Sequence, residues 1–217
     1  MMIDCAKAIL VASQPDLEVT CAFVDNAQHI ELLQKTYRIN GSFERSKSTS
    51  SATPRLRLAL EEIVVGIARG FLRLEPAAIS SGGSSNHKDE GRAYIEKVAQ
   101  EVAESRGVSG DSRWTLSPQR RDQLRIFLDL WDKGYIVTFG SKFGANFLIY
   151  KDSPKRTHAV ALIVVKRYEE EFDRVDVVSF CRVAKMVKKN FFFACVRTNE
   201  DYETGYEQFG EASEEST

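Results

Sequence analysis

Between residues 124 and 196 the chain alternates two kinds of apolar pattern, and this alternation restricts the folds open to it. Four short runs have the length and residue types of β-strands, namely residues 135–139, 147–150, 159–165 and 191–196. Two longer segments, residues 117–133 and 176–189, carry apolar residues every three or four positions, as amphipathic helices do. Short strands that alternate with helices predict a compact α/β unit.

The first half of the chain predicts a small α/β domain of its own. Residues 17–24 are typical of a strand, and residues 27–37, 55–70 and 94–105 are typical of helices. Residues 79–92 are rich in serine and glycine and predict a flexible surface loop. We expect an α+β chain with an N-terminal α/β domain at residues 1–116 and a compact mixed-sheet domain at residues 117–217.

Composition places the chain among globular proteins. Hydrophobic residues make up 43% and charged residues 28% of the 217 residues, which is ordinary for a soluble domain. The four cysteines are not spaced for zinc, so we expect reduced, mostly buried thiols; they are Cys5, Cys21, Cys181 and Cys195. The apolar run at residues 8–12 is too short for a secretory signal or a membrane span, so we expect a soluble intracellular protein without a membrane partner.

Charge is unevenly distributed along a chain whose formal net charge is -1. Residues 181–197 contain five basic residues and no acidic one, and residues 141–160 contain four basic residues and one acidic one. Residues 198–217 form an acidic tail with seven acids and no base. Basic clustering fits phosphate binding, but a solvated helix face beside a strand explains the charge equally well.

Of the three histidines, one stands in a setting that suggests chemistry. His29 lies in a predicted helix, where a structural role is favoured, and His87 lies in the serine- and glycine-rich loop. His158 follows a turn at Asp152-Ser153-Pro154, opens an apolar strand and lies close to Tyr150 in the sequence. His158 is therefore the candidate for a functional histidine.

The segment from residue 140 to residue 159 resembles the signature of the tRNA-splicing endonucleases. It reads GSKFGANFLIY and then KDSPKRTHA, matching a Lys-Phe-Gly element, a Phe-Leu-x-Tyr strand, a proline turn and a histidine. The family's third residue is a lysine at the end of the next helix, and Val187-Lys188-Lys189 matches that setting. His158 follows Tyr150 by eight positions and Lys189 follows His158 by 31, spacings that fit the family.

The resemblance extends into the first half, where the chain is similar to the eukaryotic catalytic subunit that cuts the 3′ splice site. The sequence Arg38-Ile39-Asn40-Gly41 and the helix predicted after Pro54, with its Glu61-Glu62 pair, match elements of that subunit. Asn146 stands where an acid is common in the family, and residues 151–154 depart from the commoner Pro-Gly-Asp-Pro turn.

The resemblance implies a mechanism in which the RNA supplies its own 2′-OH as the nucleophile. Tyr150 would be the base, His158 the acid and Lys189 the cation that stabilises charge at phosphorus. Histidine, with an ordinary pKa of about 6.5, suits an acid, and tyrosine, at about 10, needs nearby cations to act as a base. The products would be a 2′,3′-cyclic phosphate and a 5′-OH, and we expect no metal and no cofactor. Basic neighbours are expected to hold RNA phosphates, namely Lys142, Lys155, Arg156 and Lys188.

The resemblance also implies partners and a location. The expected partners are pre-tRNA, a second catalytic subunit and two structural subunits of a heterotetramer, and the family's commonest location is the nucleus. The uninterrupted apolar strand at residues 191–196 is predicted to pair across a subunit interface.

Three alternatives remain open on the sequence. A non-catalytic subunit of the same complex would share the fold but lack the three residues, a pure RNA-binding module would position tRNA, and a metal-dependent nuclease would be inhibited by EDTA. A tyrosine that ends a buried strand usually packs, and a lysine at a helix C-terminus usually complements the dipole. The three residues together, at family spacing, favour the catalytic interpretation.

Overall fold

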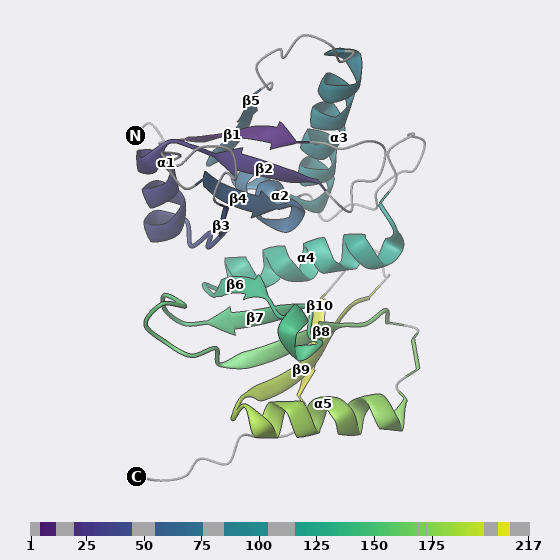
Figure 1. Ribbon diagram of the computed structural model, residues 1–217. Coiled ribbons are helices and arrows are strands. Elements are labelled where there is room, and N and C mark those ends of the chain that lie inside the picture. Colours follow the sequence, from purple (N-terminus) through teal and green to yellow (C-terminus); the bar gives the residue numbers. More distant parts are fainter. Residues whose placement is uncertain are drawn as a thin grey trace. The chain divides into compact units, whose positions relative to one another are not determined.

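The computed structural model of the protein describes residues 5–11, 20–44, 55–75, 85–103, 116–168, 170–171, 173–197 and 204–208. The chain divides into two compact units, residues 1–117 and 118–217, and each holds one mixed β-sheet with helices (Figure 1). The predicted α+β class is therefore confirmed. No helix within these described ranges is long and apolar enough to span a membrane.

The sheet of the first unit has the strand order β3-β4-β2-β1-β5. Its strands are β1 (Ala6–Val11), β2 (Cys21–Val24), β3 (Ser42–Glu44), β4 (Arg55–Ala59) and β5 (Leu72–Glu75). β1 pairs with β5 in parallel, and the other pairs are antiparallel. Residues 8–11 of the apolar run near the start of the sequence thus belong to β1, where Ala8 and Leu10 are buried.

The predicted helix at residues 55–70 is wrong in its first five residues. Residues Arg55–Ala59 form β4, and α2 (Leu60–Ala68) begins only afterwards. Leu56 and Leu58 are fully buried while the residues between and beside them are half-exposed, which is the two-residue period of a strand. Pairing with β2 on one edge and β3 on the other outweighs the helical propensity of leucine and arginine.

Glu62 joins the start of α2 to the turn before β3. Its Oε2 accepts the Ala59 N–H at 3.0 Å and its Oε1 accepts the Gly41 N–H at 2.8 Å. Gly41 has a φ of 59°, and a Cβ there would lie 2.6 Å from Leu56, so glycine is required. Gly41 and Glu62, both noticed in the sequence, therefore meet in one contact.

In the first unit, the sequence predicts the apolar faces of the helices better than the residues at which the helices begin and end. The helix predicted at residues 27–37 is α1 (Ala27–Glu31) followed by a π-helical turn, η2 (Leu32–Thr36). α3 (Ser85–Ala103) begins nine residues before the predicted start, so residues 85–92 are helical and not loop. Lysine, glutamate and arginine in this stretch are good helix formers despite its polarity. Residues 79–84 lie outside the described ranges.

The sheet of the second unit has the strand order β10-β9-β8-β7-β6. Its strands are β6 (Ile136–Phe139), β7 (Phe147–Tyr150), β8 (Ala161–Val165), β9 (Asn190–Val196) and β10 (Thr204–Gln208). β8 and β9 run parallel, and the other neighbours are antiparallel. The four predicted strands of this half are confirmed within two residues at each end.

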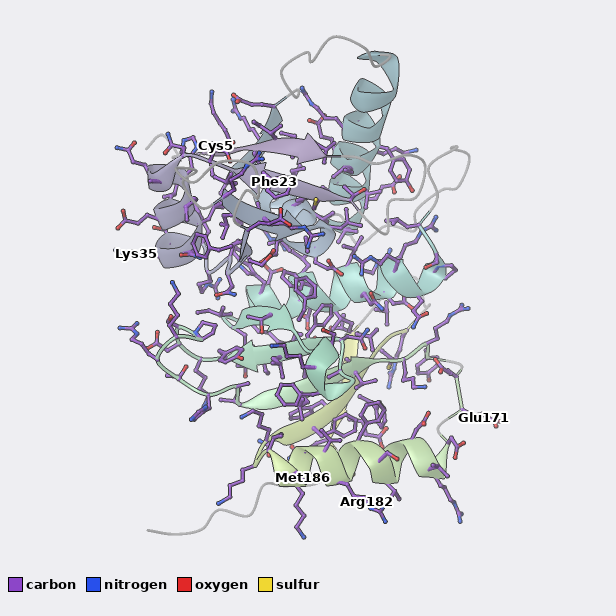
Figure 2. All side chains as sticks on the ribbon, in the orientation of Figure 1. Cys5, Phe23, Lys35, Glu171, Arg182 and Met186 are labelled. Carbon is purple, nitrogen blue, oxygen red and sulfur yellow. The ribbon has the colours of Figure 1, made fainter. Side chains whose placement is uncertain are left out.

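Two helices cover opposite faces of this sheet, α4 (Pro118–Asp132) and α5 (Arg174–Met186) (Figure 1). Phe127 of α4 packs edge-on against Phe147 at 5.4 Å between ring centroids, and Phe180 of α5 stacks on Phe191 at 5.1 Å. Figure 2 shows Arg182 and Met186 projecting from the side of α5 that faces away from the sheet. The unit is thus a three-layer α/β/α structure.

The prediction that residues 191–196 pair across a subunit interface is wrong, because both edges of β9 are already occupied. β8 pairs with one edge and β10, which the polar sequence at residues 204–208 did not predict, pairs with the other. The Tyr206 hydroxyl of β10 donates to the Asp129 carboxylate of α4, and Lys133 lies over the Tyr206 ring at 4.7 Å. Burial and this carboxylate raise the pKa of Tyr206 above its ordinary value, so the phenol stays a donor.

Candidate active site

Tyr150 is the last residue of β7 and lies at one end of the sheet in the second unit. The side chain is half-buried and packs against the core cluster that Leu148, Leu162 and Phe191 form beneath α5. β7 alternates its side chains between the two faces, so Tyr150 follows Leu148 onto the α5 face. The end of β7 therefore places the phenol of Tyr150 at the boundary between the core and solvent.

Tyr150 and Lys189 lie on either side of Val160, at the same end of three neighbouring strands. The Val160 N–H donates to the Ile149 carbonyl at 2.9 Å, and the Val160 carbonyl accepts the Asn190 N–H at 3.3 Å. The register of β7 with β8, and of β8 with β9, continues to this row. Neighbouring strands lie about 4.8 Å apart, so the Cα atoms of Tyr150 and Lys189 are about 10 Å apart.

The C-terminal turn of α5 places Lys189 in this row. Lys188 adopts a left-handed conformation with a φ of 51°, its N–H donates to the Lys185 carbonyl at 3.2 Å, and the Lys189 N–H donates to the Ala184 carbonyl at 3.0 Å. These two bonds form a Schellman motif, which ends the helix and turns the chain into β9. A cation at this point is also favoured by the negative end of the helix dipole.

His158 lies between a hydrogen-bonded turn and the buried residue Ala159. In the turn at residues 151–157, the Ser153 carbonyl accepts the N–H groups of Arg156 at 2.9 Å and Thr157 at 3.0 Å. Ala159 is buried in the core cluster beneath α5, while His158 itself is exposed. An exposed imidazole is thus held on a backbone that is fixed on both sides.

The basic residues proposed from the sequence do not all gather at this end of the sheet. Lys155 and Arg156 lie in the turn before His158, and Lys188 precedes Lys189; all three are exposed. Lys142 lies in η3 (Ser141–Phe143), which precedes β7, whereas Tyr150 is the last residue of β7. Arg156 donates from Nη2 to Asp152 Oδ1 at 2.9 Å, so its charge has a carboxylate partner in the chain itself.

Two polar residues of this region have roles that the sequence did not reveal. The sequence placed Asp152 in the turn before His158 but did not reveal that its carboxylate holds the turn at residues 151–157 together. Asn146 accepts the Val165 N–H at 2.8 Å through Oδ1 and so extends β8 beyond the last pair with β7. A carboxylate oxygen at this position would accept the same bond.

The arrangement brings a phenol, an imidazole and an ammonium group to one solvent-facing end of the sheet. Such groups can exchange protons with a bound molecule and stabilise negative charge on it. Within the described ranges, no three His, Cys, Asp or Glu side chains lie together in a group that would hold a metal ion.

Comparison with known families agrees with this region of the chain. Residues 121–204 match the family described as tRNA intron endonuclease, catalytic C-terminal domain. The matched residues fall within the second unit and include β7, β8, α5 and β9.

Curated relatives point the same way. The tRNA-splicing endonuclease of Hyperthermus butylicus is 37% identical over 70 residues, which are 32% of this chain and 39% of that protein. The tRNA-splicing endonuclease of Methanopyrus kandleri is 28% identical over 109 residues, 48% of this chain and 61% of that protein. That of Saccharolobus islandicus is 35% identical over 72 residues, 33% of this chain and 40% of that protein. The chain therefore spans between 39% and 61% of these relatives.

Proposed function

We propose that this chain is a catalytic subunit that cleaves intron-containing pre-tRNA at a splice site, because residues 121–204 match the family model of tRNA intron endonuclease catalytic domains. The single observation that carries the proposal is the position of Tyr150, His158 and Lys189. These three residues come from the end of β7, the turn before β8 and the end of α5, and they lie at one end of one sheet.

The proposed reaction is a transesterification within the RNA. Tyr150 takes the proton of the 2′-OH, whose oxygen forms a bond to the adjacent phosphorus. His158 gives a proton to the 5′-oxygen as the phosphorus–oxygen bond to it breaks, and Lys189 stabilises the charge on the phosphorane. The products carry a 2′,3′-cyclic phosphate and a 5′-OH, and the step needs neither a metal ion nor a redox partner.

An exposed histidine on a fixed backbone supports the role of proton donor. His158 is open to an RNA that arrives from solvent, and Ala159 behind it is anchored in the core. Tyr150 and Lys189 flank Val160 about 10 Å apart at their Cα atoms. Both side chains are long, so a phosphate between them is within reach of both.

The test is cleavage of an intron-containing pre-tRNA by the complex isolated through a tag on this chain, in excess EDTA. The proposal predicts undiminished cutting and fragments whose 3′ ends resist phosphatase until the cyclic phosphate is opened with acid. Loss of cutting in EDTA, restored by Mg²⁺, would favour a metal-dependent nuclease. Fragments with 3′-OH ends would contradict the mechanism.

The partners, the splice site and the location are part of the same proposal. We propose that the chain works beside a second catalytic subunit and structural subunits, cuts the 3′ splice site and resides in the nucleus. The similarity of Gly41 and the Glu61-Glu62 pair to the eukaryotic subunit supports the choice of splice site. Mass spectrometry of the tagged complex and imaging of a fluorescent fusion check the partners and the location.

A further inference from the structure

We propose that Asp152 is a positioning residue for the cleavage reaction, acting through the turn that carries His158. The proposal rests on the proposed function, because it assigns Asp152 no contact with RNA and no proton transfer. Its role is to close the turn at residues 151–157 and so to fix the backbone next to His158.

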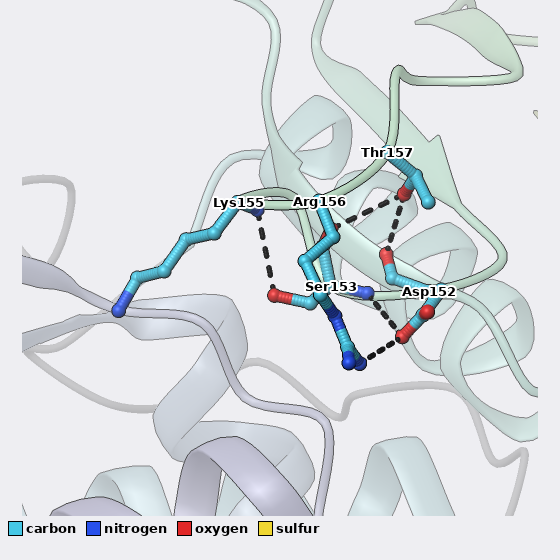
Figure 3. Close-up of polar contacts among 5 residues, drawn as sticks. All are labelled: Asp152, Ser153, Lys155, Arg156 and Thr157. Carbon is cyan, nitrogen blue, oxygen red and sulfur yellow. Dashed lines mark hydrogen bonds and ion pairs between the residues drawn. The ribbon is translucent and has the colours of Figure 1, made fainter.

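The carboxylate of Asp152 joins the first and last parts of this turn (Figure 3). Its Oδ1 accepts the Ser153 N–H at 2.6 Å and the Arg156 guanidinium at 2.9 Å. The Ser153 N–H, and then the nearby Arg156 cation, hold the pKa of Asp152 below its ordinary value, so the carboxylate is charged at neutral pH. Charge-assisted bonds of this kind are the stronger ones among side-chain hydrogen bonds.

The backbone of Asp152 also reaches the residue that precedes His158. The Thr157 hydroxyl donates to the carbonyl oxygens of Asp152 and Ser153, each at 3.2 Å. Together with the backbone bonds from Arg156 and Thr157 to Ser153, these contacts tie both ends of the turn to residues 152 and 153. The chain then enters β8 through buried Ala159, so any loosening of the turn acts directly on His158.

This geometry separates the roles of two neighbouring cations. Arg156 is committed to Asp152 and acts with it on the position of His158, whereas Lys155 projects away from the turn (Figure 3). Loss of Arg156 should therefore slow the chemical step, and loss of Lys155 should weaken RNA binding. A reacting group that moves by about 1 Å can lose about a hundredfold in rate.

The experiment is single-turnover cleavage of pre-tRNA by the isolated complex, with RNA affinity measured separately for each variant. Asp152→Ala should slow the splice-site cut assigned to this chain by about tenfold to a hundredfold. Its RNA affinity and its midpoint of thermal unfolding should stay close to wild type. Asp152→Asn keeps an acceptor for Ser153 and should lose less, and the Asp152→Ala Arg156→Ala double variant should be no slower than Asp152→Ala alone.

Lys155→Ala removes the other cation of this turn and should weaken RNA binding, so the control is Lys35→Ala, which removes a cation paired with Glu31 in the first unit and should keep the rate and the RNA affinity of wild type. A wild-type rate in Asp152→Ala would overturn the proposal. So would faster cutting and tighter binding in both Asp152 variants, because the carboxylate would then only repel RNA. His158→Ala is measured alongside: if it cuts at the full rate, the proposed function itself fails, whatever the Asp152 variants do.

Discussion

Glu62 is a buried carboxylate whose protonation should set a pH dependence of folding. Burial raises the pKa of Glu62 to about 7, and the hydrogen bonds from Ala59 and Gly41 oppose that effect without cancelling it. The folded chain therefore binds this proton more tightly than the unfolded chain, whose carboxyl has an ordinary pKa near 4.5. The stabilisation from Glu62 is complete below about pH 4.5 and is lost as pH rises toward 7.

The free energy of unfolding should accordingly fall by roughly 3 kcal/mol between pH 4.5 and 7.5 through this residue, at about 1.4 kcal/mol for each unit of pKa shift. Chemical denaturation of wild type and Glu62→Gln across that range isolates the effect, because the variant lacks this proton. Glu75→Gln, whose parent side chain is 45% exposed, serves as the control and should track wild type. Parallel curves for wild type and Glu62→Gln would contradict the assignment.

At the scale of elements, the turn that ends α5 contains Lys188, whose left-handed backbone conformation favours glycine. Lys188 has a φ of 51° at the position where a Schellman motif usually has glycine. Lys188→Gly should therefore raise the free energy of unfolding by about 1 kcal/mol. Lys185→Gly, three residues earlier within the helix, should lower it by about 1 kcal/mol. Urea denaturation of both variants gives the comparison, and equal signs would show that Lys188 is not strained.

The sequence predicted those elements whose own apolar residues show the period of a helix or a strand. β7, α5 and β9 have apolar runs or faces bounded by turns, and the structure has them within three residues of the predicted limits. β4 was mistaken for helix because Leu56 and Leu58 fit both periods, and its neighbours β2 and β3 decide between them. β10 has no apolar pattern, so its sequence did not predict a strand. Pairing with β9 and the Tyr206–Asp129 hydrogen bond hold it in place.

The same distinction applies to the candidate site. Tyr150, His158 and Lys189 were chosen from their spacing and family resemblance, and the roles given to them are proposals that cleavage assays test. The register that sets Tyr150 and Lys189 beside Val160 depends on pairing between distant segments, which one sequence does not specify. Asp152 was recognised as a turn residue, but its bond to Arg156 depends on the conformation of the turn, which the sequence does not specify.

At the scale of the whole molecule, RNA binding should depend on salt through a few local cations, because the formal net charge of the chain is only -1. Removing one phosphate contact lowers the slope of log affinity against log salt by about 0.7 to 0.9. Lys155→Ala and Lys142→Ala should each show this change in filter binding of pre-tRNA. Lys35→Ala is the control, since Lys35 pairs with Glu31 in the first unit. An unchanged slope for Lys142→Ala would mean that RNA does not reach that far end of β7.

The most direct measurement is cleavage of an intron-containing pre-tRNA by the complex carrying His158→Ala, with both splice sites followed separately. We expect that the cut at one splice site is lost, the cut at the other is retained, and the complex stays assembled. His29→Gln is the matched control and should cut both sites, because His29 accepts a backbone bond from Lys7 in the first unit. Unchanged cutting at both sites by His158→Ala would contradict the account and make this chain a structural or RNA-binding subunit.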